Sequence, residues 1–227
     1  MVNDNRALII NGKLFLPKVW IDDKDRYRKA GIPEEEIKYK TKPELALEMI
    51  DEDIRNGVEF DWVGGDGLYG HNFELSDGLD QRGLFFVLDV HKDETIFLQE
   101  HEIAVPKKKN KKGRKPTMAQ PDSEPIRLDK YLKTIKKQQW NLVRVRKTAK
   151  GWLKLKVHKV EVWIWNKEHR KLKKRTLIIS KTLENRPKIK YSFSNGGIDK
   201  YTIKDYAYFQ AQRYWVERTF DDAKNEL

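Results

Sequence analysis

The chain contains no cysteine among its 227 residues, which excludes a disulfide framework and any metal site built on thiolates. It also lacks any apolar run near the length of about 18 residues that a membrane-spanning helix needs, and its first residues show no signal-peptide pattern. The five histidines have no spacing typical of metal ligands. These absences predict a soluble, cytoplasmic protein with no membrane partner.

What the chain has is aromatic residues and an uneven distribution of charge. Seven tryptophans and an aromatic content of 11% can build a core, so the chain is not a disordered one. Residues 1–105 hold 13 Lys and Arg against 23 Asp and Glu, whereas residues 106–190 hold 29 against 6. Such a concentration of positive charge predicts a polyanionic partner, and nucleic acid fits best because Lys and Arg that contact phosphates release counterions.

The first third of the chain predicts a hairpin and a helix. Apolar runs on both sides of Asn11-Gly12 predict a tight β-hairpin over residues 7–16, because Asn-Gly favours turns with positive φ angles. A helix over residues 42–56 follows from the capping box of Thr41 and Glu44 at its start.

A βαβ unit comes next, made of a strand over 60–64, a helix over 73–82 and a strand over 84–90. Asp66 follows the first of these strands. Ligands of open α/β sheets bind at the carboxyl ends of the strands, so Asp66 is a candidate metal ligand. The alternative is that Asp66 is only a turn residue after two glycines.

Residues 106–116 (PKKKNKKGRKP) hold seven basic residues in eleven and predict a mobile loop that contacts DNA. The alternative is a loop whose charges are merely solvated. The candidate DNA-binding residues are Lys107, Lys108, Lys109, Lys111, Lys112, Arg114 and Lys115.

The segment after this loop predicts a helix and then β-structure. The helix falls at 127–136, and in residues 152–165 apolar positions mix with lysines, which gives a strand one apolar and one basic face. The tryptophans of this segment can stack on exposed bases or belong to the core. The expected strands are 141–148, 152–165, 174–180 and 188–194.

The last helix is expected from Ile203 onward, with a capping box of Thr202 and Asp205 at its start. It carries Arg213, Glu217 and Lys224 on one face. Residues four and eleven apart lie within roughly 40° of each other on a helix. A carboxylate between two cations can hold a divalent metal while the cations approach phosphate oxygens. The alternative is a surface ion-pair stripe worth a few tenths of a kcal/mol.

Two motifs resemble the catalytic domain of bacterial insertion-sequence transposases of the DDE superfamily, in the branch with a Y-R-E-K signature and a β-rich insertion. The first is Asp66-Gly67-Leu68-Tyr69-Gly70, which is similar to the D-x-x-Y-G of that branch. The second is the run R-Y-W-V-E-R-T-F-D-D-A-K over residues 213–224. Other similar stretches are Leu14-Phe15-Leu16-Pro17, Thr41-Lys42-Pro43-Glu44-Leu45-Ala46 and Tyr191-Ser192-Phe193-Ser194-Asn195.

The resemblance implies an α/β fold with an RNase H-like mixed sheet, flanking helices and a basic β-rich insertion. The parts would be core residues 1–98, a basic linker and insertion at 99–185, and core residues 186–227 with the catalytic helix. It implies cleavage of phosphodiesters at transposon ends and strand transfer into target DNA, with Mg²⁺ or Mn²⁺. The implied site residues are Asp66 and Glu217 as metal ligands and catalytic carboxylates, with Arg213 and Lys224 as catalytic cations.

The chain departs from this pattern in two places. The signature tyrosine falls at Gln210, and no residue in 1–20 has the context of the first catalytic aspartate. We therefore expect a fragment, truncated at both ends, that holds metal weakly and does not cleave DNA alone. A second hypothesis is a non-catalytic remnant that grips the DNA backbone through the basic insertion. The resemblance also allows a homodimer of the full-length protein, associated with the nucleoid.

Overall fold

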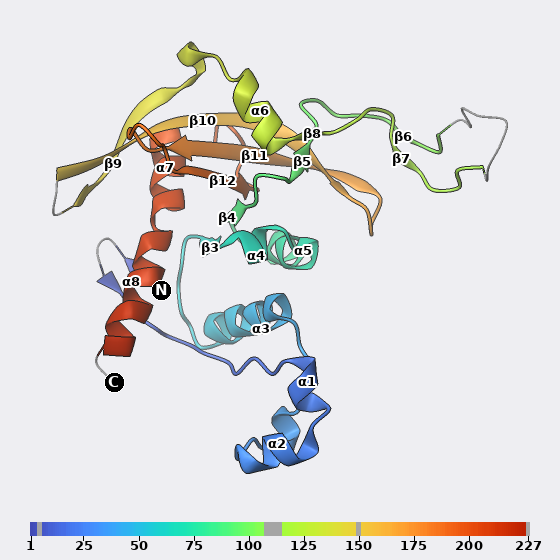
Figure 1. Cartoon of the computed structure of the whole chain (residues 1–227), viewed down its shortest axis with the longest axis vertical. Helices are drawn as coiled ribbons and strands as arrows, with labels where there is room; N and C mark the ends of the chain where they lie inside the picture. Colours follow the sequence, from blue (N-terminus) through green and yellow to red (C-terminus); the bar gives the residue numbers. More distant parts are fainter. Residues whose placement is uncertain (4–5, 107–114, 149–150, 226–227) are drawn as a thin grey trace.

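The computed structural model describes residues 1–3, 6–106, 115–148 and 151–225. Its centre is a curled six-stranded sheet in which β3 and β4 are parallel and all other neighbours are antiparallel (Figure 1). Within the described residues, no helix is long and apolar enough to cross a bilayer. In their order across the sheet, the strands are β3 (Val63–Gly65), β4 (Phe86–Val90), β12 (Ile189–Ser194), β11 (Lys171–Lys181), β10 (Gly151–Asn166) and β9 (Asn141–Thr148).

The four strands expected after residue 140 are confirmed, because β9 to β12 lie close to the predicted positions. They do not form a sheet of their own. β12 pairs with β4 through Phe193↔Leu88, so the basic strands continue the sheet that β3 and β4 begin. The division of the chain at residues 99 and 185 remains a prediction, but hydrogen bonding between strands crosses both boundaries.

The predicted βαβ unit is confirmed. β3 and β4 are parallel, and α4 (Gly67–Gly70) and α5 (Phe73–Gln81) connect them. Apolar residues of α5 pack on β4, with Leu79 and Phe86 almost fully buried, because the period of the helix turns one face toward the strand. The mixed α/β class is therefore confirmed, with a sheet that is mostly antiparallel.

The helix expected at 42–56 is α3 (Lys42–Arg55), which packs beside α5. Its capping box is present: the Glu44 amide donates to Thr41 Oγ1 at 3.3 Å, and the Thr41 amide donates to Glu44 Oε2 at 2.6 Å. Gly57 follows with a φ of 76°, the left-handed conformation that commonly ends a helix.

The two faces of the sheet are covered by different helices. α6 (Leu128–Thr134) packs over Val162, Leu177 and Tyr191, and we call this side the α6 face. α7 (Ile203–Ala211) packs over the opposite side, which we call the α7 face and which carries the residues Val87, Val143, Val157 and Ile178. Side chains alternate between the faces along each strand.

Ion pairs and an asparagine tie α5 to the sheet. Lys173 pairs with Asp77 and lies 3.4 Å from Asp80 Oδ2, and Arg175 donates to the same Asp80 oxygen at 2.5 Å. Asn195 joins three segments: its Nδ2 donates to Asp80 Oδ1 at 3.1 Å and to the Leu84 carbonyl at 2.8 Å, and its Oδ1 accepts the Phe86 amide at 3.0 Å. These contacts fix the start of β4 against the end of β12.

The hairpin predicted over residues 7–16 is wrong. The two-residue strands at the start of the chain are β1 (Val2–Asn3) and β2 (Arg6–Ala7), and residues 8–17 contain no strand. The Asn11 side chain accepts the Gly12 amide at 2.7 Å and donates to Asp53 of α3 at 3.0 Å. A contact with a distant helix therefore replaces the turn that Asn-Gly favours locally.

The last helix is interrupted. α7 ends before Gln212 and α8 (Arg213–Asn225) follows it along the same side of the molecule (Figure 1). The Gln212 amide is shared between the carbonyls of Tyr208 and Phe209, which tightens the turn at this point. The capping box of Thr202 and Asp205 at the start of α7 is confirmed.

The helix α6, described above, falls within the helix expected at 127–136. Shorter elements complete the fold. These elements are α1 (Lys18–Ile21), α2 (Lys24–Lys29), η1 (Glu34–Glu36), β5 (Thr95–Ile96) paired with β8 (Ile126–Arg127), β6 (Ile103–Ala104) paired with β7 (Gln120–Pro121), and η2 (Lys137–Gln139).

Candidate active site

Asp66 stands where β3 ends, at the carboxyl end of the parallel pair. Its Oδ1 accepts the Leu68 amide at 2.9 Å, so Asp66 caps the short helix α4. The parallel register pairs Gly65 with Leu88, and the next residues on the two strands are Asp66 and Asp89. Asp66 and Asp89 are therefore neighbours on adjacent strands. Because side chains alternate between the faces, both belong to the α7 face.

Gly70 allows α4 to lie close to β4. A methyl group at Gly70 would stand 2.0 Å from the carbonyl oxygen of Asp89 and 2.9 Å from Val90 Cγ1. Only a residue without a Cβ lets α4 approach β4 this closely. The segment Asp66–Gly70 thus fixes the backbone of one carboxylate residue against the backbone of the other.

Asp89 is a buried carboxylate, 9% exposed, in the middle of an apolar strand. The Ser192 hydroxyl donates to its Oδ1 at 2.5 Å, and Arg213 Nη1 donates to its Oδ2 at 3.4 Å. Burial raises the pKa of the Asp89 carboxyl, whereas the Ser192 hydroxyl and the charges of Lys190 and Arg213 act to lower it. Contacts from β12 and α8 therefore offset only part of the cost of burying this carboxylate.

Gln210 is the position at which the resemblance predicted a signature tyrosine. It is buried on α7, and its Nε2 donates to the Ser192 hydroxyl at 2.7 Å. Within the described residues, its Oε1 has no hydrogen-bond partner. Gln210 thus extends a chain of hydrogen bonds from Asp89 through Ser192 to the end of α7.

Arg213 connects the sheet to α8. One guanidinium nitrogen reaches Asp89 at 3.4 Å, and the other lies 3.1 Å from Glu217 Oε1. Glu217 and Lys224 are exposed on the same helix, and no ion pair of the described residues includes Lys224. The predicted helical face is present, and its arginine turns toward the sheet.

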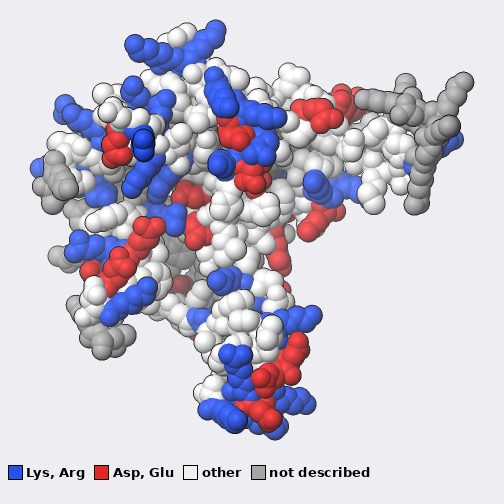
Figure 2. Space-filling view, in the orientation of Figure 1, with Lys and Arg blue, Asp and Glu red and all other residues white. Residues whose placement is uncertain are grey.

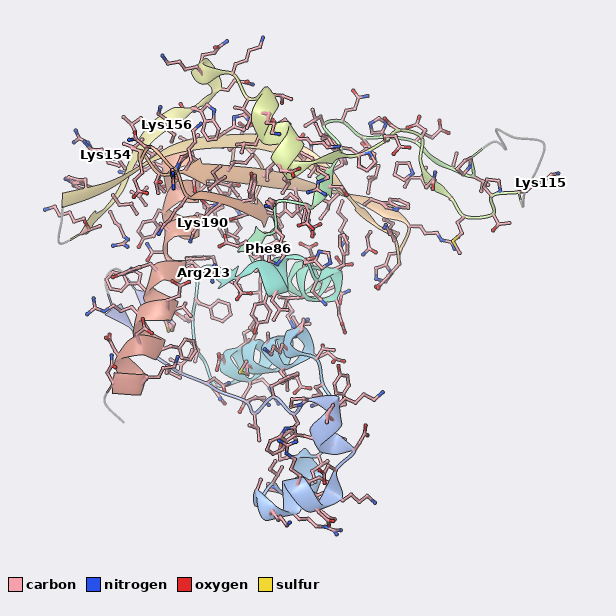
Figure 3. All side chains as sticks on the ribbon, viewed as in Figure 1. Phe86, Lys115, Lys154, Lys156, Lys190 and Arg213 are labelled. Carbon is pink, nitrogen blue, oxygen red and sulfur yellow. The ribbon has the colours of Figure 1, made fainter. Side chains whose placement is uncertain are left out.

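Two more cations lie near this point. Lys190 acts on Asp89 from β12, and Figure 3 shows Lys190 and Arg213 on the same side of the sheet. On α8, Tyr214 and Trp215 pack against the Arg146 guanidinium of β9, at 4.3 Å and 5.6 Å from their ring centres. The region therefore combines carboxylates with guanidinium and ammonium groups, the residue types that handle phosphate esters.

The carboxylates do not gather into a metal site. Among the described residues there is no group of three or more His, Cys, Asp or Glu side chains placed to hold a metal ion. The Asp66 carboxylate is engaged with its own helix, and the Glu217 carboxylate with Arg213. Carboxylate oxygen suits Mg²⁺ or Mn²⁺, but this arrangement does not present a complete ligand set.

The predicted DNA-binding loop lies mostly outside the described residues, since only Lys115 of that set is described. Lys115 is exposed and lies at the opposite end of the molecule from Arg213 (Figure 3). A cavity of about 950 Å³ opens near the start of α3 and the start of α5. None of the four predicted catalytic residues lines it.

Sequence reasoning missed Asp89. The signal was present, because Asp89 is the single charged residue in the apolar run from Leu84 to Val90. A carboxylate in a buried strand needs partners to offset the loss of hydration. Its partners, Ser192 and Arg213, lie more than 100 positions away in the sequence, so spacing could not identify them.

Comparison with known proteins places the chain in a family. A family model described as DDE superfamily endonuclease matches residues 1–151, which include Asp66 and Asp89 but not Arg213, Glu217 or Lys224. No curated protein matches the chain. Because the matched residues are more than half of the chain, this protein belongs to the DDE superfamily endonucleases.

Proposed function

We propose that this chain is the catalytic part of a transposase that cleaves phosphodiesters at transposon ends and transfers the strands to target DNA. The proposal rests on one arrangement. Within the segment matched by the endonuclease family, Asp66 follows β3 and is next in register to Asp89 of β4. Arg213 of α8 contacts both Asp89 and Glu217. The proposal includes the insertion-sequence branch with the Y-R-E-K signature and an RNase H-like sheet.

In this proposal each residue has a distinct role. Asp66 and Glu217 are the carboxylates of the reaction. Arg213 and Lys224 neutralise charge on the phosphate, since cations placed where charge develops lower the barrier. Asp89 is a positioning residue, because it touches Arg213 and holds the guanidinium between the sheet and α8.

The family implies Mg²⁺ or Mn²⁺, which would polarise the phosphodiester and activate the attacking oxygen. The described carboxylates do not form a complete set of ligands for that ion. We therefore propose that this chain by itself does not cleave DNA.

The test is incubation of the chain with an end-labelled duplex that carries candidate transposon ends, with Mg²⁺ or Mn²⁺. We expect no nicking by the chain alone, and metal-dependent nicking once the chain is extended by an upstream strand that ends in aspartate. Glu217→Gln in the extended protein is the control and abolishes that nicking. Robust cleavage by the unextended chain that depends on Glu217 would contradict the proposed inactivity.

A second candidate function is DNA binding without catalysis. It is favoured by the excess of 29 basic over 6 acidic residues in segment 106–190. Figure 2 shows Lys and Arg gathered over the upper part of the molecule, whereas both signs mix over α1 and α2. Under this alternative the chain binds duplex with a strong salt dependence, but the extended protein still does not nick it.

A further inference from the structure

Three strands of the sheet bring like charges opposite one another. Lys154 of β10 pairs in register with Arg144 of β9, and Lys156 of β10 pairs with Lys181 of β11. Next to them, Lys147 of β9 is opposite Trp152 of β10. We call the five cations the basic face; they are Arg144, Lys147, Lys154, Lys156 and Lys181.

The basic face lies on one side of the sheet. On β10, Lys154 and Lys156 alternate with Leu155 and Val157, which are buried against α7. The lysines therefore lie on the α6 face, beyond the part that α6 covers, and both are exposed. Figure 3 shows Lys154 and Lys156 above the sheet, with Lys190 and Arg213 below it.

Within the part of the chain that the structure describes, no carboxylate forms an ion pair with a member of the basic face. Like charges directly opposite each other destabilise a sheet. Burial and then the charge of Lys156 lower the pKa of Lys181, in keeping with this repulsion.

Two tryptophan rings lie against lysines of the basic face. The Lys181 ammonium lies 3.7 Å from the ring centre of Trp140, and the Lys147 ammonium lies 5.9 Å from that of Trp152. An aromatic ring attracts an ammonium group but carries no charge of its own, so the ammonium keeps its positive charge. The rings thus position the two lysines without neutralising them.

We propose that the basic face binds the phosphate backbone of duplex DNA. The inference rests on the proposed function for the kind of partner, and it assigns the contact to a surface. Uncompensated cations that repel one another in the free protein gain from a polyanion, because the phosphates remove the repulsion and counterions are released. Asp89 points to the opposite face of the sheet, so the DNA held here is a separate segment from the one at Asp66.

The experiment compares two variants with equal loss of charge. The first carries Arg144→Gln, Lys147→Gln, Lys154→Gln and Lys156→Gln. The control carries Lys18→Gln, Lys24→Gln, Lys29→Gln and Lys38→Gln, at four exposed residues that belong to no ion pair of the described residues. Duplex affinity is measured over a series of salt concentrations by fluorescence anisotropy.

We expect the first variant to lose at least tenfold in affinity at moderate salt. The slope of log K against log salt should shrink by up to about 3.6, since each phosphate contact contributes roughly 0.9. The control should change the slope by less than about 1. The first variant should also melt no lower than the unsubstituted chain, because like-charge pairs have been removed.

Each failure has a separate meaning. Duplex binding with equal slopes in the two variants overturns the assignment of this surface and leaves the proposed function standing. No duplex binding by the unsubstituted chain overturns the proposed function itself. If the fourfold variant does not fold, Lys154→Gln and Lys156→Gln are measured singly, and each should reduce the slope by about 0.9.

Discussion

Two regions of the central sheet differ in how their charges are arranged. Around β4 and the helix α5, which we call the paired end, charged groups have partners: Asp80 pairs with Arg175 of β11, and Asp89 accepts from Ser192 and pairs with Arg213. On the basic face, cations of β9, β10 and β11 lie opposite one another across the strands. The comparison indicates that the paired end is arranged for internal stability and geometry, and the basic face for an external anion.

The strongest test of the paired end is Arg175→Ala. The Arg175 side chain is 7% exposed and donates to Asp80, so its removal leaves that carboxylate with Asn195 and the more distant Lys173 as its partners. We expect a loss of about 3 kcal/mol in the free energy of unfolding. Urea denaturation followed by circular dichroism measures it.

The neighbouring residue supplies a matched control. Lys174 pairs with Glu161 at 2.8 Å, but its side chain is 59% exposed. Lys174→Ala should cost less than about 1 kcal/mol. Equal losses in the two variants would show that the paired end does not depend on buried charge.

Gly70→Ala tests the close approach of α4 to β4. The added methyl group would meet the Asp89 carbonyl, so we expect α4 to shift and the free energy of unfolding to fall by about 1–3 kcal/mol. Gly197→Ala is the control, because nothing lies within 4 Å of the added methyl group and Gly197 is not among the glycines with positive φ. Thermal unfolding of both variants is measured. A Gly70→Ala protein as stable as the unsubstituted chain would contradict the close approach of α4 to β4.

Asp89→Asn has the smallest expected effect and is measured as a pH dependence. Burial raises the pKa of Asp89 in the folded chain, so its favourable contribution is present below the ordinary carboxyl pKa and is lost as pH rises through the raised value. Relative to the unsubstituted chain, the variant should therefore gain stability as pH rises across that range.

The measurement is the difference in unfolding free energy between Asp89→Asn and the unsubstituted chain from pH 3 to 8, roughly the range over which carboxyl groups titrate. The exposed residue Asp61 provides the control variant Asp61→Asn. A difference for Asp89→Asn that moves the other way with pH would show that the Arg213 contact outweighs burial.

Local signals in the sequence predicted much of the fold. The capping boxes at Thr41 and Thr202 predicted α3 and α7, and the apolar run before Val90 predicted β4. Each of these features is decided within a few residues. The hairpin at 7–16 failed because a contact between Asn11 and Asp53, 42 positions apart, replaced the local preference.

The candidate site was predicted only in its separate parts. Asp66 was identified from the end of a strand, and Arg213 and Glu217 from helical spacing. The residue between them, Asp89, depends on strand register and on packing between segments more than 100 positions apart. Register is set by the whole sheet, so no short pattern contains it.

Arg213 contacts the carboxylates of Asp89 and Glu217, so an anion that binds its guanidinium competes with both of them. No residue of α8 is buried, so the helix is held by Arg213, by the stacking of Tyr214 and Trp215 on Arg146, and by its contact with β2. A phosphate that took the guanidinium from Asp89 would remove one of these few attachments. Binding of an anion at Arg213 would therefore weaken the attachment of the C-terminal helix to β4.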